Sequence, residues 1–317
     1  MSNSKKTKRV IEIFEEMASI YNTLGDKIRQ LAYLKAVNTI KSHSPIEKHL
    51  HELQSLPNIG RKIADKIRTI TKTDDLPKLN ELRSLPKYKA FKCLQIIPNF
   101  GKSKIENLIN IHDATTPTKI LKLYKQKKIT LTKPQLIGLK YFNETSQRIP
   151  HQEITKISKL LKDILKKVSP KATLTPVGSY RRKAKDSKDI DFILTLPSKS
   201  KCKTLLDNFI KQLKEQKIIE ETYTHGTTKF SGIIRTKYSP VAHHIDILCT
   251  TQEDYIPTLI HFTGSKTFNV LMRKHAKDMN CKFSEKGLFC NNKKIKVTSE
   301  EDVFKHLKLK YLPPHKR

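Results

Sequence analysis

The feature that most constrains this chain is the segment Asp189-Ile190-Asp191, which continues as the apolar run Phe192-Ile193-Leu194. Residues i and i+2 of a β-strand point to the same face, so the sequence predicts a strand whose two carboxylates project together while Ile190 faces a core. Adjacent carboxylates repel each other, and a divalent cation relieves the repulsion. Oxygen ligands suit Mg²⁺, which takes further ligands from substrate phosphates. The alternative, an edge strand with two exposed acids, is disfavoured because strands are depleted in Asp.

A glycine-serine turn precedes these acids and supplies the other half of a site. Gly178 lets the backbone approach a ligand closely, and the N–H groups that follow it at a helix start favour an anion. Ser179 and Arg182 are expected to bind phosphate oxygens. The turn and the acids together predict a site for a nucleoside triphosphate and its metal.

A third carboxylate is expected on a neighbouring strand, and Asp246 provides it. It stands in the segment 243–248, where apolar and polar residues alternate as they do around Asp191. Three carboxylates can hold two metal ions about 3.5–4 Å apart, and such a pair stabilises the attacking and leaving oxygens of an in-line phosphoryl displacement. The sequence therefore predicts nucleotidyl transfer, with Asp189, Asp191 and Asp246 as catalytic groups and metal ligands.

Length, charge and cysteine content narrow the class of protein. The 317 residues have room for two or three compact units, and the net charge of +33 favours a polyanionic partner bound in a salt-dependent way. No apolar run approaches the length of about 18 residues that a membrane-spanning helix needs, and no secretion signal is visible. The five cysteines are odd in number and lack C-x-x-C spacing, so we expect reduced thiols and neither a disulfide nor zinc.

The first half of the chain predicts helices joined by two similar hairpins. Apolar residues recur at three and four positions between 10 and 42, which predicts two amphipathic helices broken near 24–26. Segments 56–67 and 97–108 each contain Pro-Asn-x-Gly between apolar residues, which is typical of a helix-hairpin-helix that holds a DNA phosphate without reading sequence. A single copy would be compatible with a plain helix-helix turn. The residues expected to contact DNA are Asn58, Gly60 and Lys62 in the first copy and Asn99, Gly101, Lys102 and Ser103 in the second.

The segments 178–194, 245–248 and 261–269 resemble the family X DNA polymerases. The resemblance extends from about residue 10 to 315 and implies an α+β chain of several subdomains. These are a basic tail over 1–9, a helical lyase-like domain with the first hairpin over 10–86, and a DNA-binding subdomain with the second hairpin over 87–150. A nucleotidyltransferase palm sheet over 151–252 and a small α/β nucleotide-selection subdomain over 253–317 follow.

The resemblance also assigns site residues and cofactors. It implies two Mg²⁺ ions, with Mn²⁺ as a substitute, at the three aspartates, and Na⁺ or K⁺ at the hairpin carbonyls. Lys229 and Arg273 correspond to residues that contact DNA. The positions that correspond to nucleotide-binding residues are Gly178, Ser179, Arg182, Lys188, His261, Phe262, Gly264 and Asn269.

The helical N-terminal domain of some relatives removes a 5′-deoxyribose phosphate through a lysine amine. Alignment of the first hairpin places Lys66 at the nucleophile position, where burial or neighbouring cations must lower its pKa. Gln54 replaces one lysine of the family's phosphate site. The alternative is that Lys66 is a solvated helix lysine. The residues that fall where the family binds the 5′ phosphate are Arg29, Tyr33, Lys62 and Lys78.

Three further positions depart from the family pattern. His244 replaces an arginine two residues before the third acid, and Lys188 replaces a glycine before the first. His261 replaces the tyrosine of a Tyr-Phe pair that screens the sugar 2′ position, which predicts weaker selection against ribonucleotides.

The resemblance predicts a monomeric enzyme that fills short gaps in duplex DNA in base excision repair. Its partners would be gapped or nicked DNA and deoxynucleoside triphosphates, with no membrane, in the nucleus or another intracellular site of viral or cellular DNA repair. One alternative is a template-independent nucleotidyltransferase. Another is an inactive DNA-binding scaffold, which the retained acids, Ser179 and Arg182 argue against.

Overall fold

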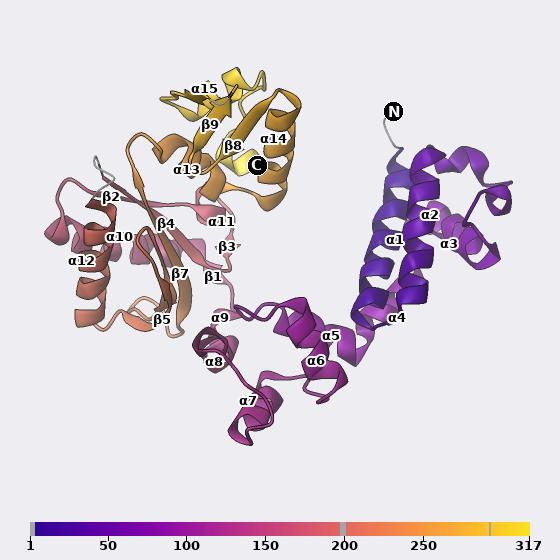
Figure 1. Ribbon diagram of the computed structural model, residues 1–317, viewed down its shortest axis with the longest axis horizontal. Helices are drawn as coiled ribbons and strands as arrows, with labels where there is room; N and C mark the ends of the chain where they lie inside the picture. Colours follow the sequence, from indigo (N-terminus) through magenta and orange to yellow (C-terminus); the bar gives the residue numbers. More distant parts are fainter. Residues whose placement is uncertain (1–3, 197–200, 292) are drawn as a thin grey trace. The chain divides into compact units, whose positions relative to one another are not determined.

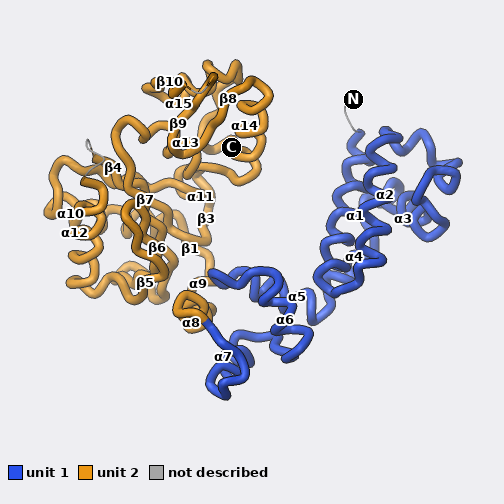
Figure 2. The backbone as a smooth tube through the Cα atoms, in the orientation of Figure 1, with its two compact units in different colours: residues 1–131 blue, residues 132–317 orange. Residues whose placement is uncertain are grey.

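The computed structural model describes residues 4–196, 201–291 and 293–317. It divides the chain into two compact units, residues 1–131 and 132–317 (Figure 2), and each is described by itself. The finer boundaries expected at 86, 150 and 252 stay predictions. Within the described ranges, no helix has the length and apolar character that crossing a bilayer requires.

The first unit is helical (Figure 1). Helices α1 (Lys5–Thr23) and α2 (Lys27–Ser42) are separated by a turn in which Gly25 has a φ of 83°, as the break near 24–26 predicts. Ser4 and Asp26 cap the two helices by accepting hydrogen bonds from backbone N–H groups. The other helical elements are η1 (Ile46–His49), η2 (Leu53–Ser55), α3 (Arg61–Thr73), α4 (Pro77–Ser84), α5 (Pro86–Leu94), α6 (Lys102–Asn110) and α7 (Pro117–Lys125).

Both predicted hairpins are present and share one backbone geometry. Asn58 and Asn99 have φ angles of 62° and 61°, the left-handed conformation that asparagine tolerates better than most residues. Gly60 and Gly101 then serve as the N-caps of α3 and α6, and neither cap forms a side-chain hydrogen bond to the helix. The first N–H groups of these two helices therefore have no capping side chain and are suited to an anion.

The second unit contains a five-stranded sheet of order β2-β4-β7-β6-β5. Its strands are β2 (Thr173–Pro176), β4 (Ile190–Leu196), β5 (Ile219–His225), β6 (Lys229–Ile234) and β7 (His243–Thr251), and only the β4–β7 pair is parallel. Helices α10 (His151–Val168) and α12 (Cys202–Glu215) pack on one face through a common apolar core with the sheet. The palm sheet that the resemblance implies is confirmed, and its strand directions make it a mixed sheet.

Smaller elements surround this sheet. Helices α8 (Lys133–Lys140) and α9 (Phe142–Thr145) precede a two-stranded pair, β1 (Ile149–Pro150) and β3 (Asp186–Ser187), and α11 (Gly178–Arg181) follows β2. A separate core holds together the last part of the chain. Its elements are α13 (Tyr255–Thr263), α14 (Lys266–Asp278), β8 (Cys281–Ser284), β9 (Gly287–Cys290), β10 (Lys293–Ile295), α15 (Glu300–His306) and η4 (Pro314–Lys316).

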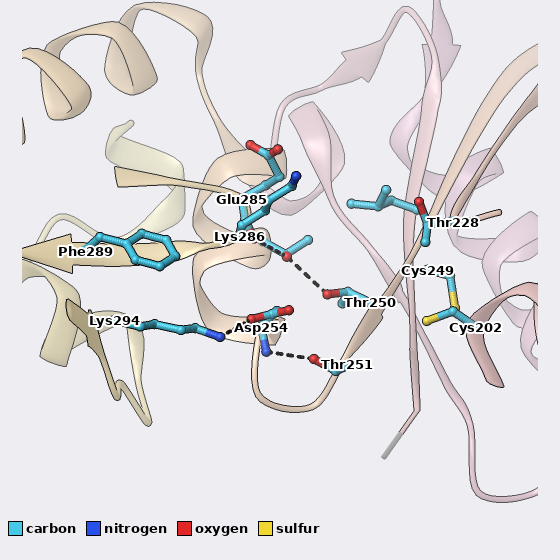
Figure 3. A pocket seen from close by; sticks show the side chains of 12 residues that line it. Cys202, Thr228, Cys249, Thr250, Thr251, Asp254, Glu285, Lys286, Phe289 and Lys294 are labelled. Atoms are coloured by element: carbon cyan, nitrogen blue, oxygen red, sulfur yellow. Dashed lines mark hydrogen bonds and ion pairs between the residues drawn. The ribbon is translucent and has the colours of Figure 1, made fainter. Parts of the chain in front are cut away.

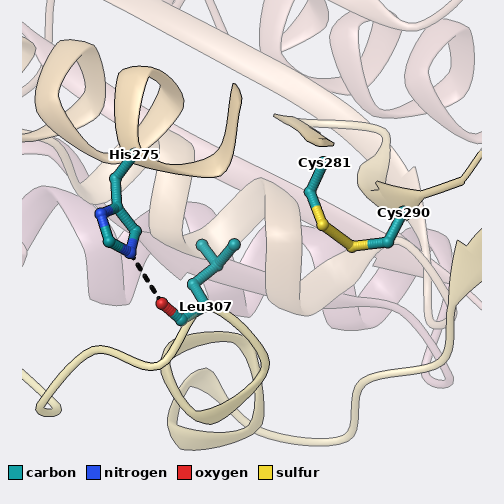
Figure 4. Close-up of a disulfide and its surroundings, with 4 residues drawn as sticks. All are labelled: His275, Cys281, Cys290 and Leu307. Atoms are coloured by element: carbon teal, nitrogen blue, oxygen red, sulfur yellow. Dashed lines mark hydrogen bonds between the residues drawn. A yellow bond between two sulfur atoms is a disulfide. The ribbon is translucent and has the colours of Figure 1, made fainter. Parts of the chain in front are cut away.

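The expectation of five reduced thiols was wrong for one pair. Cys281 and Cys290 form a disulfide between β8 and β9 (Figure 4). The two residues are direct partners in the strand register, with their Cα atoms 4.2 Å apart, so the hairpin itself brings the thiols together. The spacing of nine residues carries no signal in the sequence. Cys93, Cys202 and Cys249 are free.

Candidate active site

The sheet brings two of the three predicted acids side by side. Asp191 of β4 pairs with Asp246 of β7 in the parallel register, and Asp189 lies just before β4. Neighbouring Ile190 and Ile245 belong to the core under α10 and α12. Because side chains alternate along a strand, Asp191 and Asp246 lie on the opposite face, away from those helices.

Negative charge around Asp191 exceeds the neighbouring positive charge. Burial, followed by the charges of Asp189 and Asp246, raises the pKa of Asp191 well above its usual range, and Lys229 and Arg182 offset only part of this. The Lys229 ammonium lies 3.4 Å from Asp246 Oδ2. Lys229, predicted to contact DNA, is thus paired with an acid of the site.

The third acid has an unused oxygen. Asp246 Oδ1 is buried and has no hydrogen-bond partner. His244, which replaces the family arginine, hydrogen-bonds Ser231 Oγ at 2.9 Å, and its Nε2 lies 3.9 Å from Asp246 Oδ1. A buried carboxylate oxygen without a donor costs free energy, which a cation would recover.

These observations fit a hard divalent cation. Among residues 4–196, 201–291 and 293–317, no group of three or more acidic, histidine or cysteine side chains is already arranged around a metal position. The unpartnered oxygen of Asp246 and the repulsion felt by Asp191 are nevertheless what an oxygen-ligand site shows without its ion. The metal-binding role of the three aspartates stays a prediction.

The turn before the acids is built closely against them. Gly178 has a φ of 61°, and a Cβ at this position would overlap Asp191 Oδ2, so both the conformation and the contact require glycine. Ser179 Oγ donates to Ser187 Oγ at 2.7 Å. The Arg182 guanidinium donates to the Thr263 carbonyl, next to Gly264.

A cavity of about 570 Å³ joins the turn to the acids. Asp189 and Asp191 line it, whereas Asp246 and the exposed Lys188 do not. The remaining lining residues are Gly178, Ser179, Arg182, His261, Phe262, Gly264, Lys266, Asn269, Val270 and Arg273. Except for Lys188, the predicted nucleotide-binding residues therefore surround a single cavity.

The far end of this cavity has a fixed polar arrangement. Asn269 Nδ2 donates to the His261 carbonyl at 2.7 Å, and Asn269 Oδ1 is buried without a partner. Arg273 Nη2 lies 2.9 Å from His261 Nδ1. Arginine can only donate, so Nδ1 accepts and this hydrogen bond assigns the proton of the neutral ring to Nε2. Burial, and then the Arg273 charge, lower the pKa of His261 and favour this neutral form.

The first unit brings the predicted lyase residues together. Burial, and then Lys62 and Lys78, lower the pKa of Lys66, against the opposing charge of Asp65. Lys66 Nζ donates to the Lys62 carbonyl at 3.0 Å. A lowered lysine pKa is what an amine nucleophile needs.

Two residues predicted to bind the 5′ phosphate differ in exposure. The Arg29 guanidinium lies over the Tyr21 ring, 5.5 Å from its centre, and 66% of the Arg29 side chain is exposed. Tyr33 is buried and stacked on Tyr21. Arg29 is thus exposed but paired with Asp26 at 3.0 Å, and Tyr33 serves first as a core residue.

A second cavity lies between the end of β7 and the β8–β9 hairpin, with a volume of about 390 Å³ (Figure 3). None of the three aspartates lines it. Lys294 forms an ion pair with Asp254 at its wall, and Thr258 Oγ1 donates to the Glu285 carbonyl at 2.8 Å. The ion pair holds β10 next to the start of α13, and the hydrogen bond holds the β8–β9 hairpin against α13.

Comparison with known proteins identifies the family of this chain. The family model described as "DNA polymerase beta palm" matches residues 148–252, and the one described as "DNA polymerase beta thumb" matches residues 258–317. A third family model, "Helix-hairpin-helix domain", matches residues 5–76. The chain belongs to the family X DNA polymerases. As expected for this family, a helical N-terminal region with a helix-hairpin-helix precedes a palm sheet and a thumb.

Curated members of family X are similar over nearly the whole chain. DNA polymerase lambda of Arabidopsis thaliana is 27% identical, covering 98% of this chain and 62% of the relative. DNA polymerase lambda of Rattus norvegicus is 27% identical, covering 97% and 56%. DNA nucleotidylexotransferase of Xenopus laevis is 26% identical, covering 98% and 68%. The chain thus spans about six-tenths of the length of the two lambda polymerases.

No sequence pattern indicates a role for Glu300 and Arg317. Glu300 is hydrogen-bonded by Arg181 of the glycine-serine turn, and also by Arg317. Because 119 positions separate Arg181 from Glu300, no local pattern indicates the contact.

Proposed function

We propose that this family X chain is a template-directed DNA polymerase that fills short gaps in duplex DNA. The observation that carries the proposal is the register of Asp191 beside Asp246, next to a cavity that contains Asp189, Ser179 and Arg182. Deoxynucleoside triphosphates and gapped or nicked DNA are its proposed substrates. The two hairpins with uncapped helix starts support duplex DNA as the partner.

In the proposed reaction, the primer 3′-oxygen attacks the α-phosphorus, the bond to the β-phosphate breaks and pyrophosphate leaves. Divalent cations held by the three aspartates would stabilise the attacking and leaving oxygens. The Asp246 carboxylate, beside Asp191 in the strand register, accepts the proton of the 3′-hydroxyl. Ser179 and Arg182 exchange their present partners, Ser187 and the Thr263 carbonyl, for the phosphates that leave.

A lyase activity of the first unit is part of the proposal. The Lys66 amine attacks the aldehyde of a 5′-deoxyribose phosphate, and water is lost as the imine forms. β-Elimination then breaks the sugar C3′–O bond and leaves a 5′-phosphate on the DNA. The lowered pKa of Lys66 beside Lys62 and Lys78 supports this role.

A second candidate is template-independent nucleotide addition, which the similarity to a DNA nucleotidylexotransferase supports. Primer extension on a one-nucleotide-gapped duplex, with and without Mg²⁺, separates the possibilities. Filling that follows the template base supports the polymerase, and tails independent of the template support the alternative. DNA binding without synthesis under either condition would leave only a scaffold.

A further inference from the structure

A basic cavity of about 310 Å³ lies in the first unit, apart from the Lys66 cluster. Helix α6 forms one wall, and the segment that follows α7 forms the other. Its polar lining consists of Lys104, Asn107, His112, Lys127, Lys128 and Thr130, and none of the residues that line it is acidic. Three ammonium groups around one cavity repel each other unless an anion is present.

The acids nearest in sequence do not relieve this repulsion. Glu106 is paired with Lys102 at 3.6 Å, and Asp113 is paired with Lys119 at 3.2 Å. In the described part of the chain, no carboxylate lies within ion-pair distance of Lys104, Lys127 or Lys128. The charge of the cavity is therefore available to an external anion.

A hydrogen bond and a reversal of the chain after α7 bring the two walls of the cavity together. Lys104 Nζ donates to the Thr130 carbonyl at 2.6 Å, across 26 positions of sequence. At the end of α7, Lys127 has a φ of 57°, and the N–H groups of Lys127 and Lys128 bond back to the carbonyls of Tyr124 and Leu123. This left-handed helix end reverses the chain and returns the two lysines toward α6.

The cavity adjoins the second hairpin. Lys104 stands in the first turn of α6, whose N-cap is Gly101 of that hairpin, and Gly101, Lys102 and Ser103 are exposed. A DNA strand with one phosphate at the hairpin carries further phosphates past Lys104. We propose that this cavity is an additional phosphate site, which holds the backbone of the same DNA strand that the second hairpin binds. The proposal rests on the DNA binding of the proposed function.

The test is equilibrium binding of the full chain to a fluorescent one-nucleotide-gapped duplex over a series of KCl concentrations. Removing one lysine that neutralises a phosphate reduces the slope of log affinity against log salt by about 1, so Lys127→Ala/Lys128→Ala should reduce it by about 2. Lys122→Ala/Lys125→Ala removes the same charge from exposed positions of α7 that do not line the cavity, and it should change the slope much less. Equal slopes and affinities for the two double variants would overturn the site.

Two further arms separate the possible outcomes. Sodium phosphate in place of KCl at equal ionic strength should lower the DNA affinity of wild type more than that of Lys127→Ala/Lys128→Ala, because free phosphate competes with the DNA backbone for the cavity. Equal losses of affinity for the two proteins would contradict the DNA assignment of the cavity. Gap filling is measured at saturating DNA. If the wild-type chain binds DNA but does not synthesise, the result contradicts the polymerase proposal and leaves the cavity proposal standing. If it synthesises DNA but the two double variants have the same salt slope and affinity, the result contradicts only the cavity proposal.

Discussion

Glu300 of α15 accepts two parallel hydrogen bonds from Arg181 of α11, with 3.0 Å between Nη1 and Oε1 and 2.9 Å between Nη2 and Oε2. Arg317 donates to the same carboxylate at 2.8 Å, and its side chain is fully buried against the rings of Phe268, Phe304 and Tyr311. Arg181 directly precedes Arg182 of the proposed phosphate site. The carboxylate thus connects the last part of the chain to the turn that faces the acids.

Glu300→Ala should destabilise the chain by about 3–5 kcal/mol, because it leaves the buried guanidinium of Arg317 without its carboxylate. Urea unfolding followed by circular dichroism measures the change. Glu301→Gln, at the exposed next position of α15, is the control and should be close to neutral. Equal stability of Glu300→Ala and wild type would show that the network contributes nothing.

Glu300 should also make the stability of the chain depend on pH. Burial acts to raise the pKa of Glu300, but hydrogen bonds from Arg181 and Arg317 outweigh it and hold that pKa below its usual range. The pKa of Glu300 is lower in the folded chain than in the unfolded chain, where it is about 4.3, so the ionised carboxylate stabilises the fold at a pH above that unfolded value. This stabilisation is lost as the pH falls through the pKa of the folded state. The stability difference between wild type and Glu300→Gln should therefore shrink in acid.

Asp246→Asn should reduce gap filling by about 10²–10³-fold, because it removes a negative oxygen from the proposed metal and proton site. Without metal, the same change should not reduce stability, since it relieves repulsion on Asp191. Asp163→Asn, at an exposed position of α10, is the control for both measurements. Undiminished synthesis by Asp246→Asn would remove the third acid from the mechanism.

Lys66→Ala should abolish borohydride trapping to DNA that carries a 5′-deoxyribose phosphate, whereas Lys72→Ala on the same helix should not. Burial and the neighbouring charges of Lys62 and Lys78 lower the pKa of Lys66, so trapping should reach its plateau below the usual lysine value of about 10.4. Lys62→Ala removes one of these charges and should shift the profile to higher pH. Full trapping by Lys66→Ala would assign the imine to another amine.

His261→Tyr should increase discrimination against ribonucleotides by about 10-fold or more. The smaller imidazole, held by Arg273 with its Nε2 proton available as a donor, is expected to admit a 2′-hydroxyl more readily than tyrosine does. Single-turnover addition of each nucleotide type gives the ratio. His261→Phe separates ring size from the hydroxyl group. A wild-type ratio that neither substitution changes contradicts this role.

Cys281→Ser/Cys290→Ser should cost about 2–3 kcal/mol of stability, because the disulfide closes a short loop in the unfolded chain. Wild type in dithiothreitol should approach the variant, and Cys93→Ser, which changes a free thiol, should not. Thiol titration of the denatured, unreduced chain should find three free thiols. Five would contradict the pairing.

Local patterns made several features predictable. The alternation around Asp191 correctly placed this residue on a strand, although Asp189 lies one residue before that strand, and Pro-Asn-x-Gly indicated hairpins whose asparagines do have positive φ angles. These predictions succeed because side-chain direction in a strand and the conformation of a tight turn depend on residues close in sequence.

By itself, the amino-acid sequence determined that Asp191 and Asp246 lie on strands, that residue 178 must be glycine, that two hairpins form and that the chain is basic enough to favour DNA. Tertiary structure alone decided that Asp246 lies directly beside Asp191, that Cys281 meets Cys290, and that Glu300 joins Arg181 to Arg317. The physical reason is that strand register and the packing of distant helices are set by contacts summed over the whole core. No short segment contains that information.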